Sequence, residues 1–139
     1  RYNLPMEQNK LELYKDLIDS FNGPVLMAYN FGWNVSTVYK WLSGKDMGIT
    51  QAICIAAERP EYSVKDLANK EIACDPIYLK VIAYFGSQSN TAQALEISQP
   101  SVNGWLFKKS EISLEKAERL EEVTRGHFHP SDFPHLASA

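Results

Sequence analysis

Residues 88–106 read QSNTAQALEISQPSVNGWL, and the rest of the chain can be understood from this stretch. It fits two short helices joined by a tight turn, with Asn90 as the expected cap of the first and Pro100 in the first turn of the second, where its missing N–H costs nothing. The apolar positions have helical spacing and should face inward; they are Ala92, Leu95, Ile97, Val102, Trp105 and Leu106. The stretch is therefore predicted to be a helix-turn-helix.

The second helix of such a motif has the size and shape that fit the major groove of DNA. Gln99, Ser101 and Asn103 are predicted to point outward from it. Gln and Asn can form paired hydrogen bonds with adenine, and Ser can contact a base or a phosphate. The alternative is a merely solvated helix face, because pairs of short amphipathic helices occur in many all-helical proteins.

The composition is that of a globular chain, with 139 residues and 45% hydrophobic content, enough for one domain or two small ones. No apolar run approaches the ~18 residues of a membrane span, and no signal peptide is recognisable. Cys54 and Cys74 form no Cys-x-x-Cys pair, so a reducing intracellular setting is the simplest interpretation. The net charge of −3 argues mildly against nucleic acid, although phosphate binding needs only local positive charge.

The apolar pattern of this stretch also occurs 64 residues earlier in the chain. Val38, Trp41 and Leu42 match Val102, Trp105 and Leu106 at that shift. The preceding helix keeps the same shift, with Tyr14, Leu17, Ile18 and Phe21 matching Tyr78, Val81, Ile82 and Phe85. This agreement predicts an internal repeat of two units, residues 6–70 and 75–136.

Each unit is predicted to be a five-helix bundle, so the expected fold class is all-α with two tandem helix-turn-helix domains. Thr50 and Ser113 are expected to cap the fourth helices, and short closing helices at 62–67 and 128–133 should complete the cores. The linker at 69–75 has no Gly or Ser run, so the units are expected to touch and to hold a preferred orientation.

Three runs of the second unit carry a family likeness: FGSQSNTAQAL at 85–95, SQPSVNGW at 98–105, and the ending TRG at 124–126 followed by PSDF at 130–133. Through them the second unit resembles the Cro and YdaS-type members of the phage-repressor helix-turn-helix superfamily. The first unit resembles the same family more loosely, through Gly32 and the run VSTVYKW at 35–41. The resemblance implies a lambda-repressor-like fold and a small phage or prophage transcriptional regulator that binds a double-stranded DNA operator in the cytoplasm.

The two units depart from the family pattern in different places. Glu96 stands at the turn position that is commonly Gly, which Gly32 fills in the first unit. Pro24 stands where a phosphate-contacting Gln is common, and Val35 replaces a polar residue at the start of the reading helix. The first unit is therefore expected to be the weaker reader of DNA, or a degenerate copy kept for packing.

The predicted DNA contacts combine polar groups of the reading helices with lysines suited to phosphates and with residues at a helix N-terminus, which favours anions. In the second unit they are Gln88, Ser89, Thr91, Gln99, Ser101, Asn103, Lys108 and Lys109. In the first unit they are Asn34, Ser36, Thr37, Tyr39, Lys40 and Lys45. The alternative for Gln88, Ser89 and Thr91 is a simple capping role.

Other chemistries find little support in the sequence. Trp41 and Trp105 resemble base-stacking platforms, but the repeat assigns them to the core. His127, His129 and His135 lack a recognised metal-ligand spacing, so neither a metal nor another cofactor is expected. No nucleophile–base–acid set or phosphate loop appears, and no enzyme is expected.

The leading hypothesis is a repressor whose two units mimic a dimer and read half-sites about one DNA turn (~34 Å) apart. The alternative is a protein-interaction module, an antitoxin or antirepressor, with weak or single-domain DNA binding. A third combines DNA binding by one unit with self-association through the other. A membrane is not an expected partner.

Overall fold

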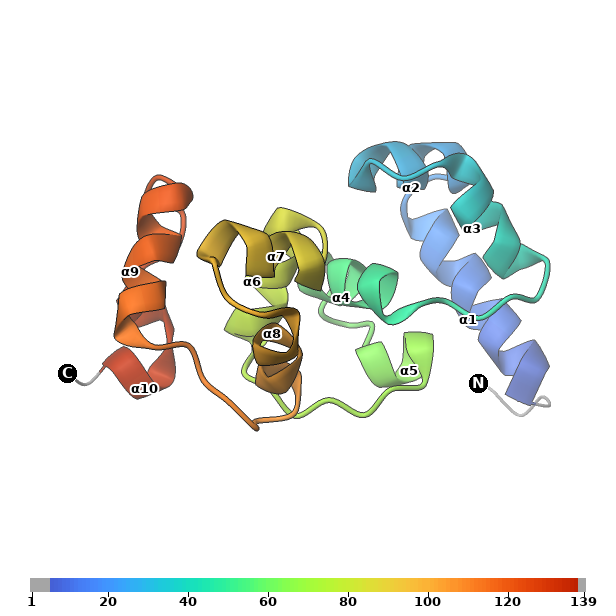
Figure 1. The fold of residues 1–139 in the computed structure, drawn as a ribbon. Coiled ribbons are helices and arrows are strands. Elements are labelled where there is room, and N and C mark those ends of the chain that lie inside the picture. The colour runs from blue at the N-terminus through green and yellow to red at the C-terminus, as the bar shows by residue number, and fades with distance from the viewer. Residues whose placement is uncertain (1–5, 138–139) are drawn as a thin grey trace.

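A computed structural model describes residues 6–137 of the chain, and all regular elements in this range are helical (Figure 1). The first half contains α1 (Met6–Ser20), α2 (Pro24–Phe31), α3 (Val35–Leu42), α4 (Ile49–Glu58) and α5 (Val64–Ala68). The second half contains α6 (Pro76–Phe85), α7 (Gln88–Leu95), α8 (Gln99–Leu106), α9 (Leu114–Val123), the 3-10 helix η1 (Pro130–Asp132) and α10 (Pro134–Ala137). The predicted all-α fold is confirmed. None of the helices within 6–137 is both long and apolar enough to cross a membrane.

The core of the first half forms around the inward stripe of α1. Four side chains at helical spacing are buried on this stripe: Tyr14, Leu17, Ile18 and Phe21. The helix ends where Asn22 and Gly23 take left-handed backbone conformations, and Pro24 starts α2 in its first turn. Trp41 of α3 is 3% exposed and lies 6.1 Å from the Tyr14 ring, centroid to centroid.

The core of the second half also contains a buried tyrosine next to a buried tryptophan. Tyr78 of α6 is buried, and its ring centroid lies 5.1 Å from that of Trp105 and 5.3 Å from that of Phe133. Leu67 in the first half and Phe133 in the second are both fully buried, as expected for residues that close the two cores. The prediction that Trp41 and Trp105 belong to the core is confirmed.

A buried tyrosine hydroxyl ties the first helix of each half to the start of the fourth. The Tyr14 hydroxyl accepts from the Met47 N–H at 3.0 Å and donates to the Leu67 carbonyl at 2.7 Å. The Tyr78 hydroxyl accepts from the Ile112 N–H at 3.2 Å. Burial raises the pKa of both phenols, because it disfavours their charged form. Each phenol therefore stays neutral and able to donate.

Two predicted helix caps are wrong. Helix α4 begins at Ile49, before Thr50, and its N-cap is Gly48, which has an extended backbone with φ −76° and ψ 161°. Helix α7 is capped by Ser87, whose hydroxyl accepts from the Asn90 N–H at 3.0 Å, while the Asn90 side chain donates to a carbonyl of the preceding helix. The Ser113 cap is confirmed, since its hydroxyl accepts from the Lys116 N–H at 3.2 Å.

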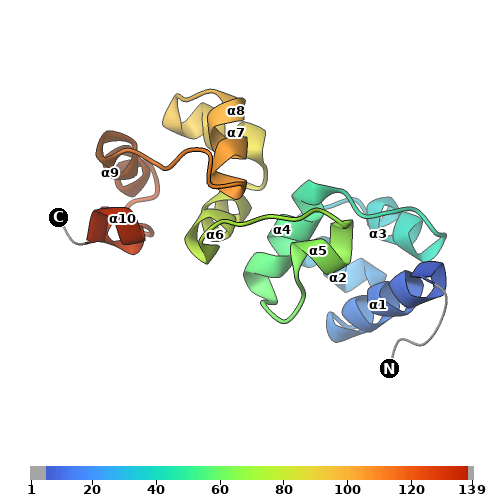
Figure 2. The same ribbon diagram turned by 90° about the horizontal axis from the view of Figure 1, so that it is seen from below.

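Helix α4 lies between α1–α3 of the first half and the helices of the second half in both views (Figures 1 and 2). Residues 52–56 are buried without a break, and α4 packs against α5 as well as α6. At its C-terminal end the Asn30 amide of α2 donates to both Glu58 carboxylate oxygens, at 2.9 and 3.1 Å. The Asn30–Glu58 bond lies within the first half, whereas the packing of α4 on α6 brings the two halves into contact, as predicted.

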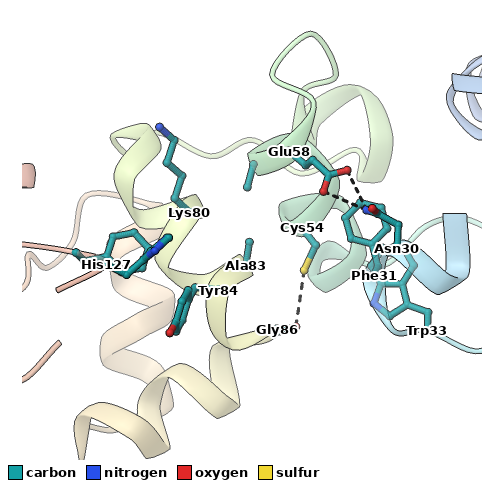
Figure 3. Close-up of a pocket in the computed structure, with 12 residues that line it drawn as sticks. Asn30, Phe31, Trp33, Cys54, Glu58, Lys80, Ala83, Tyr84, Gly86 and His127 are labelled. Atoms are coloured by element: carbon teal, nitrogen blue, oxygen red, sulfur yellow. Dashed lines mark hydrogen bonds between the residues drawn. The ribbon is translucent and has the colours of Figure 1, made fainter. Parts of the chain in front are cut away.

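An open cleft of about 410 Å³ lies beside this contact and is lined by residues of both halves (Figure 3). The Cys54 thiol donates to the Gly86 carbonyl at 3.8 Å across the contact. The linker is also held in place, because the Ala73 N–H donates to the Leu106 carbonyl at 2.8 Å. Buried residues thus connect one half to the other. The division of the chain into separate units, 6–70 and 75–136, stays a prediction.

The tyrosine hydroxyls give a stability prediction. Tyr14→Phe should lower the free energy of unfolding by about 2–4 kcal/mol, because it leaves a buried N–H and a buried carbonyl unpaired. Tyr78→Phe should cost only about 1–2 kcal/mol, since within residues 6–137 the Ile112 N–H is the only backbone partner of its hydroxyl. Urea unfolding followed by circular dichroism measures both, and a smaller loss for Tyr14→Phe than for Tyr78→Phe would contradict the assignment.

Candidate nucleic-acid interface

The N-terminus of α7 is set by a sharp corner after α6. Gly86 adopts a left-handed conformation with φ of 93°, and the Ser87 hydroxyl then caps the new helix. This corner leaves Ser89 exposed in the first turn, where a helix N-terminus favours an anion.

Two residues predicted at this N-terminus do not reach the surface. The side chain of Thr91 is 0% exposed and its hydroxyl donates to the Ser87 carbonyl at 2.8 Å, so its predicted contact with DNA is wrong. Gln88 is only 9% exposed, which removes most of its side chain from reach of a phosphate. Both residues lie on the inner side of the helix, and because Ser87 is the cap of α7, the capping alternative does not describe Thr91 either.

Glu96 forms the turn between α7 and α8 with a left-handed backbone, φ 57° and ψ 45°. Such a conformation costs a non-Gly residue roughly 1–2 kcal/mol, and Gly32 adopts it freely at φ 73° in the first half. Arg119 of α9 supports the turn: its Nη2 lies 3.4 Å from the Glu96 carboxylate, and its Nε donates to the Ala94 carbonyl at 3.1 Å. Arg119 therefore stabilises the turn in a backbone conformation that Glu96, as a non-Gly residue, disfavours.

One side of α8 faces the core and the opposite side is open. Val102, Trp105 and Leu106 are at most 2% exposed. Gln99 and Asn103, one turn apart, are both exposed. Phe107, one further turn along and 37% exposed, completes this line, and the four-residue spacing would have found it in the sequence.

Ser101 has a structural role that the sequence did not reveal. It is half-buried, its hydroxyl lies 2.9 Å from that of Ser98, and its carbonyl accepts from the Ser110 hydroxyl at 3.0 Å. The Ser110 side chain also explains the glycine in α8, because a Cβ on Gly104 would lie 2.6 Å from the Ser110 Oγ. The returning chain thus closes tightly over the inner side of α8.

Lys108 and Lys109 follow the end of α8 and are exposed. A backbone hydrogen bond from the Lys109 N–H to the Gly104 carbonyl, 2.9 Å long, fixes this turn. The exposed carboxylates Glu115, Glu118 and Glu122 belong to α9, a different helix from the one that carries the polar line. Two exposed cations thus follow α8 directly, and the exposed carboxylates nearest to them along the chain are Glu96 before the helix and Glu111 after the lysines.

The first half presents its predicted residues at the N-cap of α3, on α3 itself and in the turn that follows it. Asn34, Ser36, Tyr39, Lys40 and Lys45 are exposed, and Thr37 is half-buried. Helices α3 and α8 lie on opposite sides of α4 in Figures 1 and 2, so the structure groups the predicted residues within each half but does not bring the two groups together.

Of the histidines named in the sequence, His129 and His135 pair with carboxylates, whereas His127 contacts the Tyr84 ring. His129 Nδ1 bonds to the Glu121 carboxylate, and this hydrogen bond raises the pKa of the imidazole. His135 Nδ1 lies 3.1 Å from a Glu111 oxygen. Among residues 6–137 no three His, Cys, Asp or Glu side chains gather as a metal-binding group would.

A capped α7, a tight left-handed turn and an α8 with one exposed polar line define a helix-turn-helix of the DNA-binding class. A family model described as the DNA-binding transcriptional regulator Cro matches residues 79–134. The chain is also similar to the regulatory protein cro of Pseudomonas phage D3, at 38% identity over 56 residues that cover 40% of this chain and 77% of the relative. The chain therefore belongs to the Cro family of DNA-binding transcriptional regulators, as the sequence resemblance predicts. No solved structure matches it.

The close approach of α8 and Ser110 can be tested with a double-mutant cycle. Gly104→Ala should lower the free energy of unfolding by about 1–3 kcal/mol, because the added methyl overlaps the Ser110 hydroxyl. In a Ser110→Ala background the same change should cost nothing or stabilise α8, since Ala is the better helix former. Equal losses from Gly104→Ala in both backgrounds, measured by urea unfolding, would rule out this contact as the cause.

Proposed function

We propose that the second half is the DNA reader of this regulator and that α8 enters the major groove of its operator. The observation that carries the proposal is the exposed line of Gln99 and Asn103 on a helix whose opposite side, with Val102, Trp105 and Leu106, is buried in the core. Amide side chains one helical turn apart can each form paired hydrogen bonds with an adenine edge. Phe107 at the end of the line offers an apolar contact for a thymine methyl group.

Phosphate contacts would come from the two ends of the motif. Lys108 and Lys109 lie just beyond the C-terminal end of α8, and Ser89 lies in the first turn of α7. Contacts of this kind orient a protein on the duplex without reading its sequence. Operator occupancy in the cytoplasm of a bacterial or phage-infected cell would then block or redirect the polymerase.

A pseudo-dimer that reads DNA with both halves is the second candidate function. The exposure of Ser36, Lys40 and Lys45 in the first half favours it. Against it, Val35 and Tyr39 stand where α8 carries Gln99 and Asn103, so the first half lacks paired hydrogen-bonding groups on that line. We therefore assign base reading to α8 alone.

Base reading by α8 predicts large, sequence-dependent losses. Gln99→Ala and Asn103→Ala should each weaken binding to a selected operator by about 5- to 150-fold, the equivalent of about 1–3 kcal/mol, and should relax the base preference at one position. Fluorescence anisotropy with operator and single-base variants measures both effects. Ser131→Ala is the control, an exposed polar residue of η1, outside the elements proposed to touch DNA, that should leave affinity unchanged; equal losses for all three variants would contradict base reading by α8.

The salt dependence of binding separates the two candidate functions. Replacing Lys108 and Lys109 with Ala should reduce the slope of log K against log salt by about 0.9 for each phosphate that a lysine no longer neutralises, and by a similar amount for every DNA sequence. Replacing Lys40 and Lys45 with Ala should leave the slope unchanged if only the second half binds. A reduced slope for the Lys40 and Lys45 variant, together with a selected site of two half-sites about 10 bp apart, would support the pseudo-dimer instead.

A further inference from the structure

Helices α2 and α3 carry exposed apolar side chains on the surface that corresponds to the DNA-reading motif of the second half. Val25, Leu26 and Tyr29 are 62%, 53% and 84% exposed and share one side of α2. Helix α3 packs directly against α2 and adds Val35 at 37% and Tyr39 at 50%. We call these five residues the apolar α2–α3 surface.

The fold itself does not require apolar residues at these positions. Sixty-four residues later, the same five places are held by polar side chains that are all exposed: Ser89, Asn90, Gln93, Gln99 and Asn103. A helix-turn-helix of this chain can thus keep a fully polar outer surface. The apolar set in the first half is therefore not explained by the needs of its own core.

The size of the surface matches what a protein interface needs. Its exposed apolar area is on the order of 400 Å², taking ~200 Å² for a whole Tyr and ~100 Å² for Val or Leu. A standard interface buries about 800 Å² per partner, of which somewhat more than half is apolar. The five residues can supply nearly all of that apolar share.

The charge of the surface favours a partner identical to the chain itself. Helix α2 contains no charged residue, and Lys40 is the one charged residue of α3. Two copies of a chain with net charge −3 can pair here without bringing carboxylates of these helices together. In a two-fold arrangement the same apolar patch meets itself, which makes it self-complementary.

We infer that two copies of this chain associate through the apolar α2–α3 surface. The family match covers residues 79–134, so this role concerns a part of the chain outside that match. The surface lies on the far side of α4 from α8, which leaves both α8 helices of such a dimer free (Figures 1 and 2). Use of both helices on one operator rests on the proposed function, whereas the association itself does not.

The test measures the oligomeric state of the full chain without DNA, so a failure of DNA binding cannot affect it. Sedimentation equilibrium should show a dimer at about 100 µM. The variant Val25→Ser, Leu26→Asn, Tyr29→Gln carries the residues found at the equivalent places of the second half. It should weaken association at least tenfold while helicity and the urea midpoint stay near those of the unchanged chain.

The matched control removes exposed apolar groups of similar accessibility from α9, with Leu114→Asn and Val123→Ser. This control should dimerise like the unchanged chain. If the α2 variant loses helicity, Tyr29→Gln alone provides the measurement, since that ring is the most exposed of the five. The inference would be overturned if the unchanged chain is monomeric, or if it is a monomer that binds a different protein through α2. It would also be overturned if the α9 control weakens association equally, or if folded α2 variants dimerise normally.

Discussion

Helix α4 has no free side along residues 52–56, and this burial determines how the rest of the molecule is arranged. A helix that is apolar all round must be covered all round. In this chain α5 covers part of it, α6 of the other half covers another part, and Arg59 just beyond its end donates to the Ser20 carbonyl of α1. The two halves are therefore held together by packing, in addition to the short linker.

The helix at the corresponding place of the second half has the opposite character. Helix α9 buries only Ala117 and Leu120 and leaves most of its glutamates in solvent. Its inner side also supports the recognition motif, because Arg119 reaches the turn at Glu96. The fourth helix therefore has different roles in the two halves. Helix α4 joins the halves, whereas α9 stabilises the turn before the reading helix α8.

Hydrophobic periodicity predicted most of the fold, because it reports which side of a helix is buried. The stripe of α1, the two core tryptophans and the closing residues Leu67 and Phe133 all followed from spacing. The cap of α4 did not, because Thr and Gly are about equally favoured as caps and the local sequence does not decide between Thr50 and Gly48. The packing of α4 on α6 is a tertiary contact that no local pattern encodes.

The candidate interface was predicted only in part. Spacing identified Gln99 and Asn103 as outward-facing, and the lysines after α8 are exposed as expected. Thr91 was misplaced because a threonine in the first turn can face the core and bond to a backbone carbonyl, and Phe107 was missed because apolar residues were assigned to the core by type. The two halves also differ in surface chemistry more than their shared core pattern indicates.

The contact between the halves contains its own chemical reporter. The Cys54 thiol is buried there, and that burial raises its pKa, so it holds little reactive thiolate near neutral pH. Only 6% of Cys54 is exposed, on the wall of the cleft, so an alkylating reagent should reach this sulfur more readily when α4 and α6 separate, whereas the half-buried Cys74 is less protected. The ratio of the two alkylation rates in the unaltered chain therefore reports how often the halves come apart in solution.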